Sequence, residues 1–207
     1  MSQPTLLLAE KWGVRDIAYC GIIAGLYAVL TIILAPLSYG VYQIRVSEAL
    51  TVLPFIYAPA AIGLFVGCFV ANIFGGNGLQ DIVFGSLLTL AAGFSTAFMS
   101  KLNSKKLSGI FAPIFLLPIL PIYLIVFCWL VPVYREKLSW GVLLAPLPPV
   151  IINAFGVALY LAGIIGVPYW DAVALIGAGQ LVACYALGLP FLIFLLLMKR
   201  TPLGVSA

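Results

Sequence analysis

Residues 42–54, YQIRVSEALTVLP, place charged side chains between two strongly apolar segments. Arg45 and Glu48 lie three residues apart, so on a helix they would share one face. Charges at the edge of a hydrocarbon layer, or inside it, are costly unless they are paired or face a polar cavity. The pattern has two interpretations, an ion pair at the membrane interface and a binding site for a small molecule. Isolated polar residues elsewhere in the chain favour the binding site.

The composition is typical of an integral membrane protein with several spans. The chain has 207 residues, of which 64% are hydrophobic and 8% are charged, whereas soluble domains carry about 25% charged residues. This length fits a single membrane domain, residues 1–207. With no His and no GxxxxGK[ST] phosphate loop, we expect neither a zinc site nor ATP hydrolysis by the chain itself. We also expect no cofactor and no nucleic-acid partner.

The apolar segments predict a bundle of helices embedded in the lipid bilayer of the cell membrane. Residues 17–34 form the first predicted span, and Lys11 and Arg15 before it place the N-terminus in the cytoplasm. Pro54 and Pro59 break the following apolar run, which predicts two short helices at about 47–57 and 60–74.

Three further spans are expected, at 82–100, at 140–165 and in a last segment that ends at 198. Lys199 and Arg200 follow this last span, so the C-terminus is also predicted to be cytoplasmic. Residues 110–134 are apolar but are broken by four prolines and flanked by basic residues. We interpret them as an additional hairpin or helix that enters and leaves on the cytoplasmic side; a true span is the alternative.

Small residues recur at four-residue spacing in the first span, as Gly21 and Gly25 and as Ala24 and Ala28. Such a stripe lets another helix approach closely. Spacing alone does not decide whether that helix belongs to this chain or to a partner.

The isolated polar residues are Gln43, Arg45, Glu48, Asn72, Asn77, Gln80, Asp81, Asn153 and Gln180. They offer carboxylates and amides without a nucleophile–base pair, which predicts recognition of a ligand and not catalysis. A carboxylate can accept two parallel hydrogen bonds, as from the N1–H and 2-amino group of a guanine. Alternative roles stay open for some of them, since Asp81 could cap a helix and Asn72 or Gln180 could join two helices.

The runs YQIRVSEALTVLP (42–54), GLFVGCFVANIFGG (63–76), LQDIVFGSLLTL (79–90) and PPVIINAFGVAL (148–159) together resemble the QueT family. The family consists of queuosine-precursor substrate-binding subunits, the S components of energy-coupling factor (ECF) transporters. The resemblance implies an all-α bundle of six transmembrane helices with a site closed from outside by the first loop. It also implies partners, namely a membrane T component and two cytoplasmic ATPase subunits. Ala24 and Ala28 resemble the motif by which S components dock on the T component.

Two features depart from the family pattern. Residues 110–134 look like an insertion, and Gln180 stands where the family usually has a glutamate after Gly179. An amide brings no charge, so Gln180 tilts ligand choice toward a neutral compound, or toward one whose amine finds Glu48 or Asp81.

The sequence thus predicts a substrate-binding subunit for uptake of a 7-deazaguanine by an ATP-driven ECF transporter, and not an enzyme. The predicted site residues are Gln43, Arg45, Glu48, Asn72, Asp81, Asn153 and Gln180. The alternative is an autonomous secondary transporter or channel for a small polar heterocycle, for which we see no internal repeat.

Overall fold

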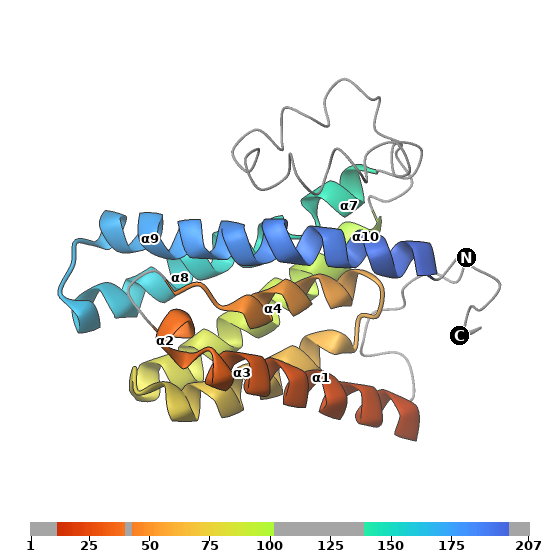
Figure 1. Cartoon of the computed structure of the whole chain (residues 1–207), viewed down its shortest axis with the longest axis horizontal. Helices are drawn as coiled ribbons and strands as arrows, with labels where there is room; N and C mark the ends of the chain where they lie inside the picture. The colour runs from red at the N-terminus through yellow and green to blue at the C-terminus, as the bar shows by residue number, and fades with distance from the viewer. Residues whose placement is uncertain (1–11, 40–42, 102–138, 199–207) are drawn as a thin grey trace.

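The computed structural model describes residues 12–39, 43–101 and 139–198, and every regular element in these ranges is a helix (Figure 1). The first part contains α1 (Val14–Ile33), α2 (Ala35–Ser38), the 3-10 helix η1 (Val46–Phe55), α3 (Ala60–Gly75), the π-helix η2 (Asp81–Gly85) and α4 (Ser86–Met99). The second part contains α7 (Trp140–Leu144), α8 (Leu147–Ile165), α9 (Tyr169–Leu181), the π-helix η5 (Val182–Gly188) and α10 (Leu189–Met198).

Four helical stretches in the described residues are long and apolar enough to cross a membrane. They are Val14–Ile33, Asp81–Met99, Trp140–Ile165 and Tyr169–Met198. Helices η1 and α3 are apolar but shorter, with 10 and 16 residues, as the sequence predicted from Pro54 and Pro59. The all-helical fold class is therefore confirmed, whereas six spans remain a prediction. The predicted hairpin at 110–134 lies outside the described residues.

Local sequence explains where these helices begin and end. Pro59 precedes α3, and Gly76 after it adopts a left-handed conformation with φ 72°. Gly166 ends α8 in the same way, with φ 71°. A left-handed residue at this position releases the chain from the helix, and glycine adopts it without steric cost.

The helices pack in the order α1, α3, α4, α8 and α9, and each contacts the next. The continuous stretch from α9 through η5 to α10 lies on the opposite side of the bundle from α1 (Figure 1). Helix η1, from the charged stretch at residues 42–54, contacts α1, α3, α4, η5 and α10. Its central position explains why seven of its ten residues are buried.

Two glycines of α3 bring its backbone close to α1. A Cβ atom added at Gly63 would lie 2.7 Å from the carbonyl oxygen of Cys20, and one at Gly67 would lie 2.7 Å from that of Ala24. Part of the small-residue stripe of α1 therefore packs inside this chain. A Cβ added at Gly21 or Gly25 would meet no atom within 4 Å in the described structure.

Candidate functional site

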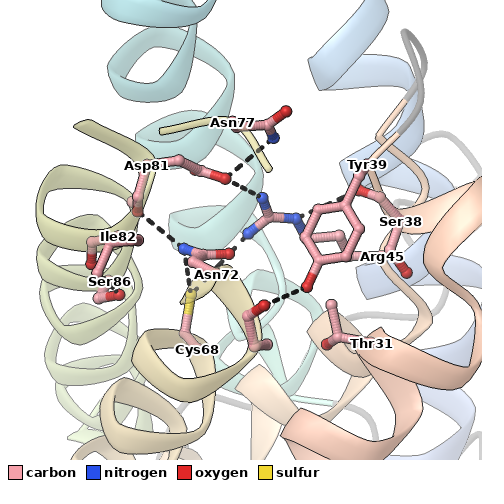
Figure 2. A network of polar contacts seen from close by, with 12 residues as sticks. Thr31, Ser38, Tyr39, Arg45, Cys68, Asn72, Asn77, Asp81, Ile82 and Ser86 are labelled. Carbon is pink, nitrogen blue, oxygen red and sulfur yellow. Dashed lines mark hydrogen bonds and ion pairs between the residues drawn. The ribbon is translucent and has the colours of Figure 1, made fainter. Parts of the chain in front are cut away.

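The ion pair of Arg45 lies inside the bundle and joins two distant parts of the chain (Figure 2). The Arg45 guanidinium Nη2 donates to Asp81 Oδ2 at 3.0 Å, and both side chains are at most 4% exposed. Arg45 Nε also donates to the Ser38 carbonyl at 3.4 Å, and the guanidinium lies 5.6 Å from the centre of the Tyr39 ring. Burial alone would lower the pKa of Arg45, but the Asp81 carboxylate raises it and the net shift is upward. Arg45 therefore stays charged.

Asp81 receives hydrogen bonds from three separate segments of the chain. Its Oδ2 accepts from Asn77 at 3.0 Å as well as from Arg45, and its Oδ1 accepts from the Tyr160 hydroxyl of α8 at 2.6 Å. The helix begins before Asp81, and its carboxylate makes no capping bond. The capping role that the sequence left open is thus wrong, and Asp81 fastens the segment before η1 to the α3–α4 turn and to α8.

Glu48 is fully buried and is not paired with Arg45. Its Oε1 accepts from the Tyr27 hydroxyl of α1 at 2.5 Å, and its Oε2 accepts from Asn153 Nδ2 of α8 at 3.3 Å. In the described ranges the salt bridge is that of Arg45 with Asp81. No Lys or Arg nitrogen of these ranges lies within 4.0 Å of the Glu48 carboxylate. The interpretation as an interfacial ion pair of Arg45 with Glu48 is therefore wrong.

The orientation of two buried amides is fixed by partners that can only accept. Asn72 Nδ2 donates to the Asp81 carbonyl at 2.8 Å, and Asn153 Nδ2 donates to Glu48. A carbonyl or carboxylate oxygen offers no proton, so the amide nitrogen must face it and the amide oxygen must point elsewhere. Asn72 Oδ1 and Asn153 Oδ1 are buried and have no hydrogen-bond partner among the described residues. Buried polar atoms in native proteins are nearly always bonded to protein, to ordered water or to a ligand, so these two oxygens make this region the candidate site.

Gln43 and Gln180, the two remaining predicted site residues, are also buried. Gln43 is 2% exposed with φ 42°, and its Nε2 lacks a hydrogen-bond partner in the described structure. A positive φ is uncommon outside glycine and marks a constrained backbone. Gln180 is buried, its Oε1 lies 3.5 Å from the thiol of Cys184, and this thiol lies 3.6 Å from the Glu48 carbonyl. Gln180 thus reaches η1 through Cys184, and its role as a ligand contact stays a prediction.

Sequence reasoning did not select Tyr27 and Tyr160. Each donates its hydroxyl to a buried carboxylate, Tyr27 to Glu48 and Tyr160 to Asp81. Their positions in the sequence could have indicated this role. Both tyrosines fall well inside predicted apolar spans, where a hydroxyl group requires a hydrogen-bond partner. The described residues contain no group of three or more His, Cys, Asp or Glu that could hold a metal ion.

Gly85 makes room for this network. A Cβ added there would lie 2.7 Å from Asp81 Oδ1, 3.0 Å from the Tyr160 hydroxyl and 3.1 Å from Asn72 Nδ2. We expect Gly85→Ala to lower the free energy of unfolding by about 1–3 kcal/mol, the usual cost of overpacking. Gly163→Ala is the matched control, because a Cβ there meets no described atom within 4 Å. Equal thermal shifts for the two variants would contradict the tight packing at Gly85.

The chain matches the family described as QueT transporter over residues 17–197.

The chain therefore belongs to the QueT family.

It is also 36% identical over 83 residues to a protein of Lactococcus lactis subsp. cremoris (strain MG1363) named queuosine precursor transporter QueT. The match covers 39% of this chain and 48% of the relative, so the chain spans about half the length of the curated relative that it matches. No solved structure matches the chain.

Membership in the QueT family confirms the resemblance seen in the sequence. It assigns the chain to a family of multi-pass membrane transporters and not to enzymes, in agreement with the several spans predicted from composition and with the recognition chemistry predicted from the polar residues. The QueT match includes all seven predicted site residues, from Gln43 to Gln180, and both alanines of the α1 stripe. The roles of these individual residues remain predictions.

Proposed function

We propose that this QueT family member is the membrane-embedded substrate-binding subunit, or S component, of an ATP-driven ECF transporter. Its ligand is a queuosine precursor of the 7-deazaguanine type. Family membership and the printed name of the Lactococcus relative support this class of ligand. The observation that carries the proposal is the fully buried Glu48 carboxylate, which is held by neutral donors beside an amide oxygen that lacks a partner.

These groups match the hydrogen-bonding edge of a deazaguanine. The base offers N1–H and a 2-amino group as adjacent donors, and a carboxylate such as Glu48 can accept both. The free oxygens of Asn72 and Asn153 are further acceptors for ring or amino N–H groups. Gln43 Nε2 is a donor of the kind that a ring carbonyl requires. Arg45 and Asp81 do not contact the ligand in this proposal; they hold the segment that carries Gln43 against η2 and, through Tyr160, against α8.

Energy for uptake comes from partners, because this chain carries no phosphate-binding loop. The partners are a T component and two cytoplasmic ATPase subunits, and the T component docks on the exposed side of the small-residue stripe of α1, beside Ala24 and Ala28. Gly21 and Gly25 support this site, since they lie on the exposed side of the same stripe. The chain is a single domain of six membrane helices, with both termini in the cytoplasm.

Ligand binding to the purified full chain tests the site. We expect Glu48→Gln to weaken binding of 7-aminomethyl-7-deazaguanine by about 1.5–3 kcal/mol, the worth of a hydrogen bond to a charged group. Isothermal titration calorimetry measures this loss. Asp171→Asn is the matched control, since it removes a carboxylate that is exposed at the start of α9. Unchanged affinity in a folded Glu48→Gln variant would exclude Glu48 from the site.

A further inference from the structure

Ser38 carries a buried hydroxyl group that the site described above does not use. It is the last residue of α2 and is fully buried, and its Oγ has no hydrogen-bond partner within the described ranges. The other buried side-chain atoms without a partner in these ranges are Gln43 Nε2, Asn72 Oδ1 and Asn153 Oδ1. All three belong to residues that the sequence predicted for the ligand site. Burying a hydroxyl without a hydrogen bond is costly, so Ser38 requires an explanation of the same kind.

The usual local partner of a helical serine is already occupied at Ser38. A serine in a helix can donate its hydroxyl to the carbonyl four residues earlier, as Ser86 does to Ile82 at 2.7 Å. For Ser38 this carbonyl is that of Leu34, which already accepts two backbone N–H groups. They come from Leu37 at 2.9 Å and from Ser38 itself at 2.8 Å. A carbonyl oxygen has two lone pairs, so the Ser38 hydroxyl must find its partner outside its own helix.

Hydrogen bonds hold Ser38 against the Arg45 guanidinium. The Ser38 carbonyl accepts from Arg45 Nε at 3.4 Å, and Arg45 is itself fixed by the ion pair with Asp81. Arg45 Nη1 lies 3.9 Å from the Cys68 thiol, which also accepts from Asn72 Nδ2 at 3.4 Å. Figure 2 shows the guanidinium between Ser38 and Asn72. Two buried residues with an unpaired oxygen atom therefore flank one immobilised side chain.

We infer that the Ser38 hydroxyl is a further ligand contact, which hydrogen-bonds the deazaguanine on the Arg45 side of the site. This inference rests on the proposed function and deepens it by adding a residue that selects the ligand. The amide oxygen of Asn72 can only accept a hydrogen bond, whereas a hydroxyl can accept from an N–H group or donate to a ring nitrogen. Ser38 thus adds a polar contact of a kind that the amide oxygens do not provide. A site built to hydrogen-bond a polar atom discriminates against analogues that lack this atom.

The ligand-free and ligand-bound chains should respond differently to loss of this hydroxyl. In the ligand-free chain the hydroxyl of Ser38 is buried without a partner, so its removal relieves a cost and should not lower stability. In the complex the hydroxyl makes a hydrogen bond, so its removal should weaken ligand binding. A serine with a purely structural role would show the opposite pattern, with lower stability and unchanged affinity.

The variant Ser38→Ala of the purified full chain tests this inference. Thermal unfolding without ligand should give a midpoint equal to or higher than that of the wild type. Isothermal titration calorimetry with 7-aminomethyl- and 7-cyano-7-deazaguanine should give an affinity about threefold to tenfold lower for each compound that the wild type binds, the factor of one neutral hydrogen bond. Ser86→Ala is the matched control, because Ser86 is equally buried but its hydroxyl is bonded to the Ile82 carbonyl. Its affinity for both compounds should equal that of the wild type.

The outcomes separate the role of Ser38 from the class of ligand. A lower unfolding midpoint for ligand-free Ser38→Ala would overturn the inference, since the hydroxyl would then have a partner in the free chain. Unchanged affinity in Ser38→Ala, or an equal loss in Ser86→Ala, would also overturn it and leave the proposed function standing. Failure of the folded wild-type chain to bind either compound would overturn the proposed function, and this inference with it.

Discussion

Replacing Arg45 with alanine is expected to lower the free energy of unfolding by about 3–5 kcal/mol, the cost of removing one partner of a buried ion pair. The variant leaves the Asp81 carboxylate fully buried with only Asn77 and Tyr160 as donors. It also removes the link between the segment before η1 and the start of η2. Because the same segment carries Gln43, ligand binding should weaken together with stability.

Thermal unfolding followed with a thiol-reactive dye measures this effect. The assay uses a Cys128→Ser background, in which the dye reports on Cys20, Cys68 and Cys184, the free and buried cysteines of the described residues, as the bundle opens. Arg15→Ala is the matched control, since Arg15 is exposed on α1. Substitutions of exposed residues usually change the unfolding free energy by no more than about 0.5 kcal/mol.

A double variant separates the ion pair from other effects of each substitution. Arg45→Gln and Asp81→Asn should each lower the free energy of unfolding. The double variant should lower it by less than the sum of the two single losses, because no unpaired charge remains. The expected coupling energy falls within the range of about 0.5–3 kcal/mol found for residues in contact. Strictly additive costs would contradict a direct interaction of Arg45 with Asp81.

Gly25→Trp is expected to abolish uptake while ligand binding by the isolated subunit survives. Gly25 is exposed, and an added Cβ meets no described atom within 4 Å, so the bundle itself tolerates a side chain there. A helix of a partner could no longer approach the α1 stripe. Ala28 is a poorer test position, because it is 7% exposed and packs in the core with Tyr27, Leu64 and Cys68.

The control for docking is Leu26→Trp, which adds bulk to a half-exposed residue one position further along α1. Successive residues differ by about 100° around a helix, so Leu26 points away from the stripe and should retain uptake. Normal uptake by Gly25→Trp would exclude this face as the docking surface. Loss of ligand binding in the same variant would show that the face packs within this subunit.

The sequence predicted the helices more completely than the contacts between them. Prolines at 54 and 59 and glycines at 75 and 76 interrupt long apolar runs, and each interruption is local, so η1 and α3 could be located within two residues. The 3-10 geometry of η1 and the π-helical turns at Asp81–Gly85 and Val182–Gly188 could not be predicted. Such turns arise where tertiary packing overrides the local preference of the chain.

The polar residues of the site were predicted as a set, but their pairing was not. Arg45 lies three residues from Glu48, yet it pairs with Asp81, which is 36 residues away. Glu48 instead meets Asn153, 105 residues along the chain. Spacing on one helix indicates which side chains share a face, but the partner across the bundle depends on how α3, α4 and α8 pack. For the same reason Tyr27 and Tyr160 were not recognised, although each completes one of the two carboxylate clusters.

Uptake of labelled 7-aminomethyl-7-deazaguanine into proteoliposomes tests the central claim most directly. The purified chain alone should bind the compound but should not accumulate it, with or without ATP inside the vesicles. The same chain reconstituted with a T component and two ATPase subunits should accumulate the compound only when ATP is present on the ATPase side. Accumulation by the chain alone, driven by an ion gradient, would contradict the account and identify an autonomous carrier.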